Sequence, residues 1–320
     1  MSLPLVSIVT PAYNEEKLLA ECIESVLSQS YVHWDYLIVD NCSTDATATI
    51  ARNYAAVDSR IRVITNAALI PAVRNINLGL RNISSESTYC KVVFADDILL
   101  PGCLDQMVGL MEAHSGVGIT GAYGIDGQWV LWEGIPYFKN VVSGRDICRE
   151  RLLGGPYVFG SATSVLFRSE LVRNRDPFFD ESIVHATDSD ACFDILKKWD
   201  FGFVHQVLTF SRVREGSLLE ASKSLNASAA DTLREVFEYG PFYLDAPEFS
   251  RRFKEIVLSY YDFLAGSLRR RHSGEFWAFH KANLRNCGVH FSWLAVVQAI
   301  GRKILRRLRV TNDTPQRWGL

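Results

Sequence analysis

Two adjacent carboxylates, Asp96 and Asp97, directly follow the apolar run of residues 90–95. Such a run predicts a buried strand, and α/β proteins bind ligands at the carboxyl edge of a parallel sheet. Two neighbouring carboxylates repel each other unless a cation or a proton lies between them. The simplest interpretation is a hard divalent cation that carboxylate oxygens bind and that in turn holds a diphosphate. The alternative is a solvated turn, in which Asp is common.

Aromatic and polar residues also stand next to earlier apolar runs. Tyr13 follows the first run, where its ring could stack on a base while Asn14 or Thr10 bonds the polar edge of that base. Asp40 ends the second run and could accept hydrogen bonds from a uracil ring or a ribose. Arg74 precedes the run that leads to the acid pair, where its guanidinium could contact a base or a phosphate. Taken singly, each of these residues would also fit an ordinary turn or a solvated surface.

The elements that must position these residues alternate along the first part of the chain. Short apolar runs predict strands, and the stretches between them place apolar residues on one helical face. This order predicts an open, mostly parallel sheet flanked by helices. The expected strands are 5–10, 36–39, 61–65 and the run that ends at the acid pair, and the expected helices are 15–29, one capped by Ser43 with Asp45 in its first turn, 72–83 and one that begins at Pro101.

The pattern changes after residue 116 and becomes helical after about residue 217. We therefore expect an α/β domain over residues 1–217 and a helical extension over residues 218–320. The expected strands of the second half of the domain are 117–123, 128–132, 162–167 and 201–211, its expected helices are 146–153 and 188–199, and the helical stretches of the extension are about 247–270, 274–286 and 291–309.

Length and composition fit a soluble globular protein. The chain has 320 residues, of which 48% are hydrophobic and 22% charged, so that a large core can form. No stretch reaches the ~20 consecutive apolar residues of a membrane span, and the first residues lack the features of a signal peptide. Seven scattered cysteines without metal-ligand spacing favour reduced thiols. The sequence therefore predicts a cytoplasmic protein.

Charge is unevenly distributed along the chain. Residues 1–248 hold 20 Lys and Arg against 32 Asp and Glu, whereas residues 249–320 hold 14 against 4. Within 291–309, an apolar and aromatic half is followed by five cations, which is the pattern of an interfacial helix on an anionic membrane. A packing helix with a solvated basic end is the alternative. Nucleic acid is a poorer partner because the main domain is net acidic.

Taken in order, four segments resemble the family 2 nucleotide-sugar glycosyltransferases of the GT-A fold. The resemblance covers roughly residues 4–215 and implies a nucleotide-binding half, 1–115, and an acceptor half, 116–217. It also implies inverting, metal-dependent transfer of one sugar from a nucleoside-diphosphate sugar, for which a UDP-sugar is the first expectation. The acceptor would be a saccharide or a lipid-linked molecule in the assembly of polysaccharide or glycolipid. Such acceptors would suit a protein on the inner face of a membrane. The four segments are 7–15, 39–45, 74–75 and 94–97 with Pro101.

The family pattern implies roles for particular residues. Asp97 would be a direct ligand of Mn²⁺ or Mg²⁺, with Asp96 near the metal or the ribose. Arg212 and Arg214 lie in a segment similar to the family's closing loop, in which Arg214 stands in place of the usual His. A guanidinium cannot bind a metal, but it can clamp a phosphate, and a basic surface loop is the alternative. The segment 160–163 is expected to shape the acceptor side. The residues expected around the donor are Thr10, Pro11, Ala12, Tyr13, Asn14, Asp40, Arg74, Asp96, Arg212 and Arg214.

The same resemblance implies a catalytic base in a later acidic segment. Asp188 matches the position of this base, and a carboxylate at a helix N-terminus is held ionised, which suits proton abstraction. Asp190 and His185 are competing candidates for the same role. A simple helix cap is the alternative interpretation of Asp188.

The chain departs from the family pattern at Phe94, Thr187 and Asp194, where Asp, Glu and Arg are usual. These departures favour, as an alternative, a non-catalytic protein that binds nucleotide sugars. A sugar nucleotidyltransferase is a further alternative, although the Gly-rich loop that it needs is absent after the first strand. Residues 316–318 lack the spacing and place of the signature of processive relatives, so we expect the addition of one sugar rather than a polymer.

Overall fold

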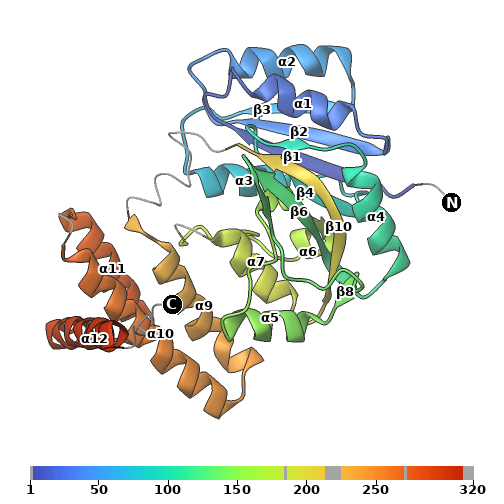
Figure 1. Cartoon of the computed structure of the whole chain (residues 1–320). Helices are drawn as coiled ribbons and strands as arrows, with labels where there is room; N and C mark the ends of the chain where they lie inside the picture. Colours follow the sequence, from blue (N-terminus) through green and yellow to red (C-terminus); the bar gives the residue numbers. More distant parts are fainter. Residues whose placement is uncertain (1–2, 184–185, 213–224, 270–271, 313–320) are drawn as a thin grey trace, which may run out of the picture. The chain divides into compact units, whose positions relative to one another are not determined.

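The structure is a computed structural model, in which the chain divides into two compact units, residues 1–214 and 215–320 (Figure 1). The first unit contains the sheet, and the second consists of helices. Side chains are described as far as residue 305. The described residues are 3–183, 186–212, 225–269 and 272–312.

A mixed sheet forms the centre of the first unit. Its ten strands, within the described residues, are β1 (Val6–Ala12), β2 (Trp34–Asp40), β3 (Ile61–Thr65), β4 (Tyr89–Val92), β5 (Ile98–Leu99), β6 (Val117–Asp126), β7 (Trp129–Leu131), β8 (Val141–Val142), β9 (Val165–Arg168) and β10 (Asp200–Ser211). The order is β3-β2-β1-β4-β9-β6-β10-β5, with β7 beside β6 and β8 beside β10. Strands β1 to β4 are parallel, as is the pair β6–β10, and the other pairs are antiparallel. The predicted α/β fold with an open mixed sheet is confirmed.

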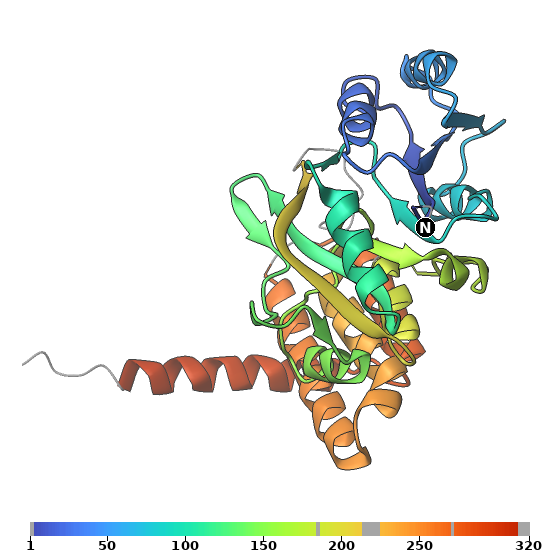
Figure 2. The same ribbon diagram turned by 90° about the vertical axis from the view of Figure 1, so that its right-hand side faces the viewer.

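Helices cover both faces of this sheet. They are α1 (Leu19–Leu27), α2 (Thr47–Val57), α3 (Ala72–Arg81), α4 (Cys103–Ala113), α5 (Gly144–Leu152), α6 (Ser169–Arg173) and α7 (Thr187–Ile195), with a 3₁₀ turn, η1 (Ala162–Ser164). Figure 2 shows α4 lying along β10. Successive side chains of β1 point to opposite faces, so Ile8 joins a core cluster with α1 and α4 while Val9 meets α3. Only glycine fits at position 79 of α3, because a Cβ there would lie 2.4 Å from Cγ1 of Val9.

The segment around the acid pair differs from the prediction. The strand β4 ends at Val92, so the acids lie in a turn that is closed by a 2.9 Å main-chain hydrogen bond from Asp97 to Phe94. The short strand β5 follows and pairs with β10. The helix α4 therefore begins at Cys103 instead of the predicted Pro101. A local apolar pattern could not show this two-residue strand, because it forms only by pairing with a distant segment.

The second unit confirms the predicted helical extension. Its helices, within the described residues, are α9 (Ser228–Tyr243), α10 (Ala246–Ser267), α11 (Gly274–Asn286) and α12 (Trp293–Asn312). In its core, His280 bonds to the Tyr260 hydroxyl at 2.6 Å and to the Leu225 carbonyl oxygen at 2.8 Å. Burial lowers the pKa of His280 to about 4, which keeps this imidazole neutral. Among the described helices, none combines the length and the apolar character that crossing a membrane requires.

Candidate active site

The carboxyl ends of β1 and β2 lie side by side in the structure. The register of the two parallel strands places Ala12 opposite Asp40 and Pro11 opposite Val39. The backbone of Pro11 and Ala12 therefore forms the rim next to Asp40. The Thr10 hydroxyl lies below this rim, because it is fully buried and bonds to the Tyr36 hydroxyl at 2.8 Å.

Hydrogen bonds tie the loops that follow β1 and β2 to each other. The Asn14 main-chain N–H donates to the Ser43 hydroxyl at 3.0 Å, and the Thr44 N–H donates to Oδ1 of Asn14 at 2.8 Å. The N-cap residue of α2 is Ala46, and Oδ1 of Asp45 accepts a 3.0 Å bond from the N–H of Thr47, so the prediction that Ser43 is the N-cap was wrong. Asn14 and Ser43 thus hold the two loops together, while the ring of the adjacent Tyr13 is 44% exposed.

Asp40 is a fully buried carboxylate at the end of β2. Its Oδ1 accepts a 3.3 Å hydrogen bond from the main-chain N–H of Ser43. Its Oδ2 is also buried and has no hydrogen-bond partner among the described residues. A buried polar atom without a partner is costly, so Oδ2 of Asp40 is a candidate to accept a hydrogen bond from a bound ligand.

An amide network that sequence patterns did not reveal supports the same edge. The Nδ2 of Asn66 donates to Oδ1 of Asn41 at 2.9 Å and to Oδ1 of Asn75 at 2.8 Å. Asn75 in turn donates to the main-chain oxygen of Val39 at 3.0 Å. The network fixes the segment after β3 against the end of β2. Asn41 and Asn75 stand in the segments 39–45 and 74–75, but their mutual partner Asn66 could not be recognised, because the three residues are far apart along the chain.

Asp97 lies almost buried beside the 3₁₀ turn η1. The Thr163 hydroxyl donates to Oδ2 of Asp97 at 2.5 Å and accepts a 3.1 Å bond from the N–H of Phe94. Burial raises the pKa of Asp97 to about 7, and the neighbouring charge of Asp96 adds to the rise, against bonds from Thr163 and Ser211. The run predicted as a strand over 162–167 is divided between η1 and β9, and this division brings Thr163 to the acid pair.

Arg212 approaches the acid pair from the end of β10. Its guanidinium donates to the main-chain oxygen of Asp96 at 3.1 Å and pairs with Glu21. These contacts show that Arg212 holds the turn that carries the acids. Arg214 lies outside the described residues.

The acid pair fits one kind of metal site. No group of three His, Cys, Asp or Glu side chains in the described part of the chain could hold a metal by itself. Mn²⁺ and Mg²⁺, however, are commonly bound by one or two carboxylates, with phosphate oxygens and water as the remaining ligands. The raised pKa of Asp97 reflects a buried negative charge that a cation would offset. The residues present therefore suit a cation shared with a diphosphate, rather than a cage formed by protein alone.

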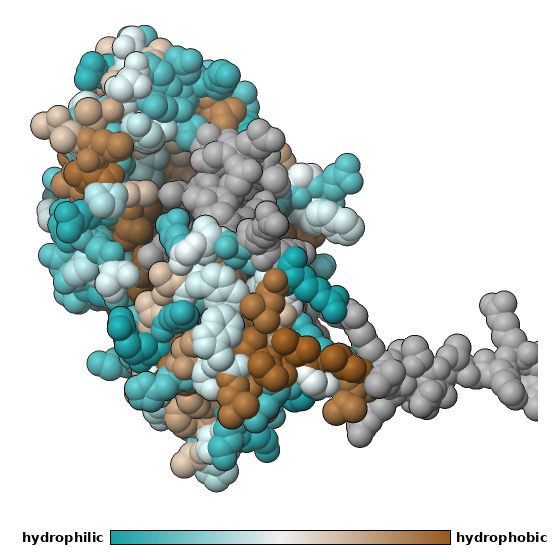
Figure 3. Space-filling model, turned by 90° about the vertical axis from the view of Figure 1, so that its left-hand side faces the viewer, coloured by the Kyte–Doolittle hydropathy of each residue, from teal (hydrophilic) through white to brown (hydrophobic). Residues whose placement is uncertain are grey.

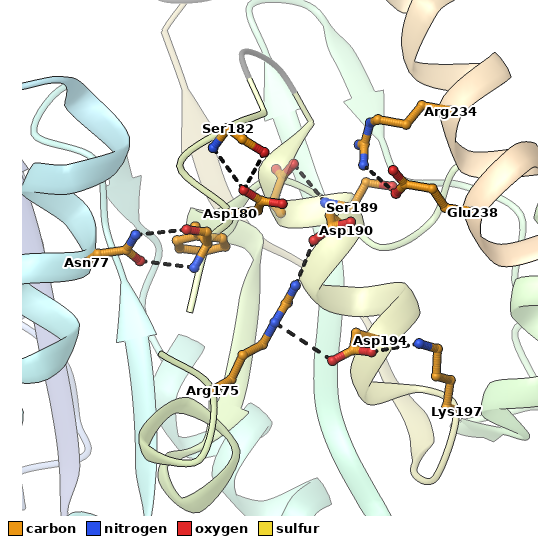
Figure 4. Close-up of polar contacts among 12 residues, drawn as sticks. Asn77, Arg175, Asp180, Ser182, Ser189, Asp190, Asp194, Lys197, Arg234 and Glu238 are labelled. Atoms are coloured by element: carbon orange, nitrogen blue, oxygen red, sulfur yellow. Dashed lines mark hydrogen bonds and ion pairs between the residues drawn. The ribbon is translucent and has the colours of Figure 1, made fainter. Parts of the chain in front are cut away.

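Two acids at the start of α7 have different surroundings, and Figure 4 shows one of them, Asp190, beside Arg175. Asp188 is partly exposed in the first turn, where its Oδ1 accepts a 2.9 Å bond from the N–H of Ser189. Asp190 is 3% exposed and accepts a 2.6 Å bond from Arg175, which also lies 3.7 Å from Asp194. Asp190 is thus committed to a buried ion pair, which favours Asp188 as the base. The third candidate, His185, lies outside the described residues.

The segment that leads to α7 is anchored on α3. Arg74 bonds through Nε to Glu181 at 2.9 Å, and Nδ2 of Asn77 bonds to the same carboxylate at 3.2 Å. Asn77 also exchanges two hydrogen bonds, of 2.8 and 2.9 Å, with the main chain of Phe179. Arg74 is therefore engaged with Glu181, although its side chain remains 60% exposed. These bonds hold the approach to Asp188 beside the first turns of α3.

Comparison with protein families and known proteins places this geometry in context. The family model described as glycosyl transferase family 2 matches residues 7–174. A glycosyltransferase of Haemophilus influenzae is 27% identical over 194 residues, 58% of each chain. Glycosyltransferase GlyG of Streptococcus pneumoniae is 28% identical over 252 residues, 73% of this chain and 78% of GlyG.

A third relative carries a more specific name. The Escherichia coli protein WfgD, a UDP-Glc:alpha-D-GlcNAc-diphosphoundecaprenol beta-1,3-glucosyltransferase, is 30% identical over 141 residues, 42% of this chain and 54% of WfgD. The chain thus spans little more than half the length of WfgD and of the Haemophilus relative.

Solved structures of two proteins share the fold. TarS 1–349 of S. aureus in complex with UDP-GlcNAc has a TM-score of 0.64 at 17% identity, over 88% of this chain and 80% of TarS 1–349. The mannosyltransferase PcManGT of Pyrobaculum calidifontis, in complex with GDP-Man and Mn²⁺, has a TM-score of 0.56 at 15% identity, over 94% of this chain and 79% of PcManGT.

Proposed function

Since the chain belongs to glycosyltransferase family 2, we propose that it transfers one sugar from a UDP-sugar to an acceptor hydroxyl, with inversion at the anomeric carbon. The observation that carries the proposal is Oδ2 of Asp40, which is buried without a partner among the described residues. The N3–H of uracil is a donor of the right kind for this oxygen, and the exposed ring of Tyr13 could stack on the same base. The names of TarS complexed with UDP-GlcNAc and of WfgD support a uridine nucleotide.

Asp188 is the proposed general base. Its carboxylate removes the proton from the acceptor hydroxyl while that oxygen forms a bond to the anomeric carbon. The bond between this carbon and the β-phosphate oxygen breaks, and UDP departs with the electron pair. Attack from the face opposite to the leaving group inverts the configuration. Asp188 lies in the first turn of α7, where the helix N-terminus favours negative charge.

Asp97 and Asp96 are the proposed holders of Mn²⁺ or Mg²⁺. When bound, the cation would stabilise the negative charge that develops on the leaving diphosphate. Thr163 fixes one oxygen of Asp97, and Arg212 fixes the main chain of Asp96, so the two carboxylates are positioned before the donor arrives. The Mn²⁺ present with PcManGT supports a divalent ion in this fold.

The second unit is proposed to meet the anionic inner face of a membrane through residues 291–309. Figure 3 shows apolar side chains gathered on this part of the unit. Lys281 lies 5.0 Å from the ring centroid of Phe291, and aromatic and cationic groups together favour a lipid interface. This placement supports a lipid-linked acceptor in the assembly of cell-surface polysaccharide or glycolipid. Among the side chains of α12 that the structure describes, up to residue 305, the exposed large apolar ones are Trp293, Leu294, Val297, Ile300, Ile304 and Leu305.

A donor panel tests the proposed function. The chain is incubated with Mn²⁺, an acceptor extract and each of several UDP-, GDP- and ADP-sugars, and release of the nucleoside diphosphate is measured. We expect release from a UDP-sugar only. Calorimetry with UDP and Mn²⁺ accompanies the panel, because tight binding without turnover of any donor would favour the non-catalytic alternative.

A further inference from the structure

Lys91 is a fully buried lysine in β4. Its ammonium group donates to the main-chain oxygen of Thr163 at 2.7 Å and to that of Val165 at 3.3 Å. The third contact of the ammonium group is the sulfur of Met107, at 3.6 Å. These partners are neutral, although a buried charge normally lies beside an opposite charge. An apolar side chain would suffice for packing at this position. The presence of a lysine therefore needs a further explanation.

The side chain of Lys91 spans a gap in the sheet. The strands β4 and β9 pair only at Tyr89 with Arg168 and at Cys90 with Phe167. From Lys91 onward, the main chain of β4 forms no strand pairing with η1, the segment that precedes β9. The ammonium group replaces this pairing, because it binds two carbonyl oxygens at the junction of η1 and β9.

The bonded residue Thr163 leads directly to the acid pair. Its carbonyl oxygen accepts from Lys91, and its hydroxyl donates to Oδ2 of Asp97. The hydroxyl also accepts from the N–H of Phe94, so its single proton is committed to Asp97. A continuous path of bonded groups therefore joins the buried ammonium group to the proposed metal ligand.

We propose that Lys91 is a positioning residue for the metal site, which fixes Thr163 so that its hydroxyl orients Asp97. The inference rests on the proposed function, because it concerns the site that holds the donor diphosphate. The ammonium group holds the turn η1, and the turn sets the direction of the Thr163 hydroxyl. Oδ2 of Asp97 is thereby fixed, and with it the orientation of the carboxylate that would hold the cation. The positive charge of Lys91 also offsets part of the negative charge of the acid pair in the same interior.

The test compares UDP affinity in Mn²⁺ with UDP affinity in EDTA, by titration calorimetry on the full chain. In Lys91→Met, we expect the Mn²⁺-dependent gain in affinity to fall by about tenfold or more, as is common when a residue that orients a metal ligand is lost. Affinity in EDTA should stay within about twofold, because Lys91 does not contact the nucleotide edge. The matched control is Val92→Ala in the same strand, which loosens packing and should leave the Mn²⁺-dependent gain unchanged.

Variants of Thr163 test the path itself. Thr163→Val removes the hydroxyl at nearly constant volume and should reproduce the loss of Lys91→Met, whereas Thr163→Ser keeps the hydroxyl and should retain most of the gain. A folded Lys91→Met chain with the wild-type gain would overturn the proposal. If that variant does not fold, Lys91→Gln is used with the same expectations. A wild-type chain without any Mn²⁺-dependent gain would instead refute the metal site, and the role of Lys91 with it.

Discussion

Arg175 donates a 2.6 Å hydrogen bond to Oδ2 of Asp190, and this ion pair distinguishes two acids that lie on the same turn of α7. The side chain of Asp190 is 5% exposed and that of Arg175 is 22% exposed, so the pair is largely removed from water. Asp188, in contrast, lies partly exposed at the helix N-terminus. The structure thus gives Asp190 a role in holding α7 and leaves Asp188 as the better candidate for proton transfer.

Replacement of the proposed base should affect turnover and not donor binding. In Asp188→Asn, we expect kcat to fall by on the order of a hundredfold or more, because an amide cannot accept the acceptor's proton. UDP affinity in Mn²⁺ should remain within about twofold, since Asp188 does not hold the nucleotide. Wild-type kcat in this variant would show that the base lies elsewhere.

The neighbouring acid should respond in the opposite way. Asp190→Asn removes the 2.6 Å partner of the partly buried Arg175 and leaves its guanidinium with the longer 3.7 Å contact to Asp194, so we expect the unfolding free energy to fall by about 1–3 kcal/mol. Turnover per folded molecule should be largely kept. Urea denaturation and active-site titration measure the two quantities, and an intact stability with lost turnover would reverse the two assignments.

The buried carboxylate of Asp40 should select uracil. Cytosine lacks the N3–H donor, so the wild-type chain should bind UDP more tightly than CDP. Asp40→Asn weakens the hydrogen bond from a charged to a neutral one, and we expect UDP affinity to fall about tenfold, with a smaller UDP-to-CDP ratio. Asp58→Asn, at the far end of α2, is the matched control. An unchanged ratio in Asp40→Asn would remove Asp40 from base recognition.

The stability of the metal-free chain should depend on the ionisation of Asp97. Its folded-state pKa of about 7 lies above its ordinary value of 3.8, so the folded chain keeps a proton that the unfolded chain has lost. Stability therefore falls as the pH rises from about 4 to 7, by up to about 4 kcal/mol. Asp97→Asn does not lose stability in this way. Its Tm should therefore be higher than that of the wild type at pH 8 and equal to it below pH 4.

This comparison isolates Asp97, because all other titrations are common to the two chains. Addition of Mn²⁺ and UDP at pH 8 should raise the Tm of the wild type and not that of Asp97→Asn. If the curves of Tm against pH for the wild type and Asp97→Asn were parallel, Asp97 would not carry this buried charge.

The exposed apolar stripe of α12 should mediate vesicle binding. Leu294, Val297 and Ile304 are 67%, 61% and 52% exposed, so their simultaneous replacement by Ser leaves the core intact. We expect co-sedimentation with anionic vesicles to fall several-fold, and binding of the wild type to weaken at high salt. Ser replacements at the exposed Val57 and Leu69 of the first unit provide the control. Equal co-sedimentation of the two variants with anionic vesicles would show that the apolar residues of α12 do not mediate binding to lipid.

The parallel half of the sheet could be predicted because its signal is local. The run Ile61–Thr65 was predicted with its exact bounds, and the apolar core of β2 was predicted within two residues of each end. Short β-branched runs between amphipathic helices require no knowledge of distant partners. For the same reason, Asp40 could be selected from its place at the end of β2, and the acid pair from the apolar run before it, although β4 itself ends at Val92.

The residues that were missed depend on contacts between distant segments. Lys91 stands within an apolar run and looks like an interruption of it, until η1 brings two carbonyl oxygens to its ammonium group. Arg175 stands in a loop and gains its role only when α7 folds against it. The sequence also suggested that Ser43 caps a helix, whereas the fold uses its hydroxyl to bind the loop that follows β1.

The central claim is that Asp97 and Asp96 bind a cation that holds the diphosphate of a UDP-sugar. The most direct test is a crystal of the chain grown with a UDP-sugar and Mn²⁺, measured at the manganese absorption edge. We expect an anomalous peak within about 2.5 Å of an Asp97 carboxylate oxygen and in contact with the diphosphate. A structure with the donor bound and no peak at Asp97 would contradict it.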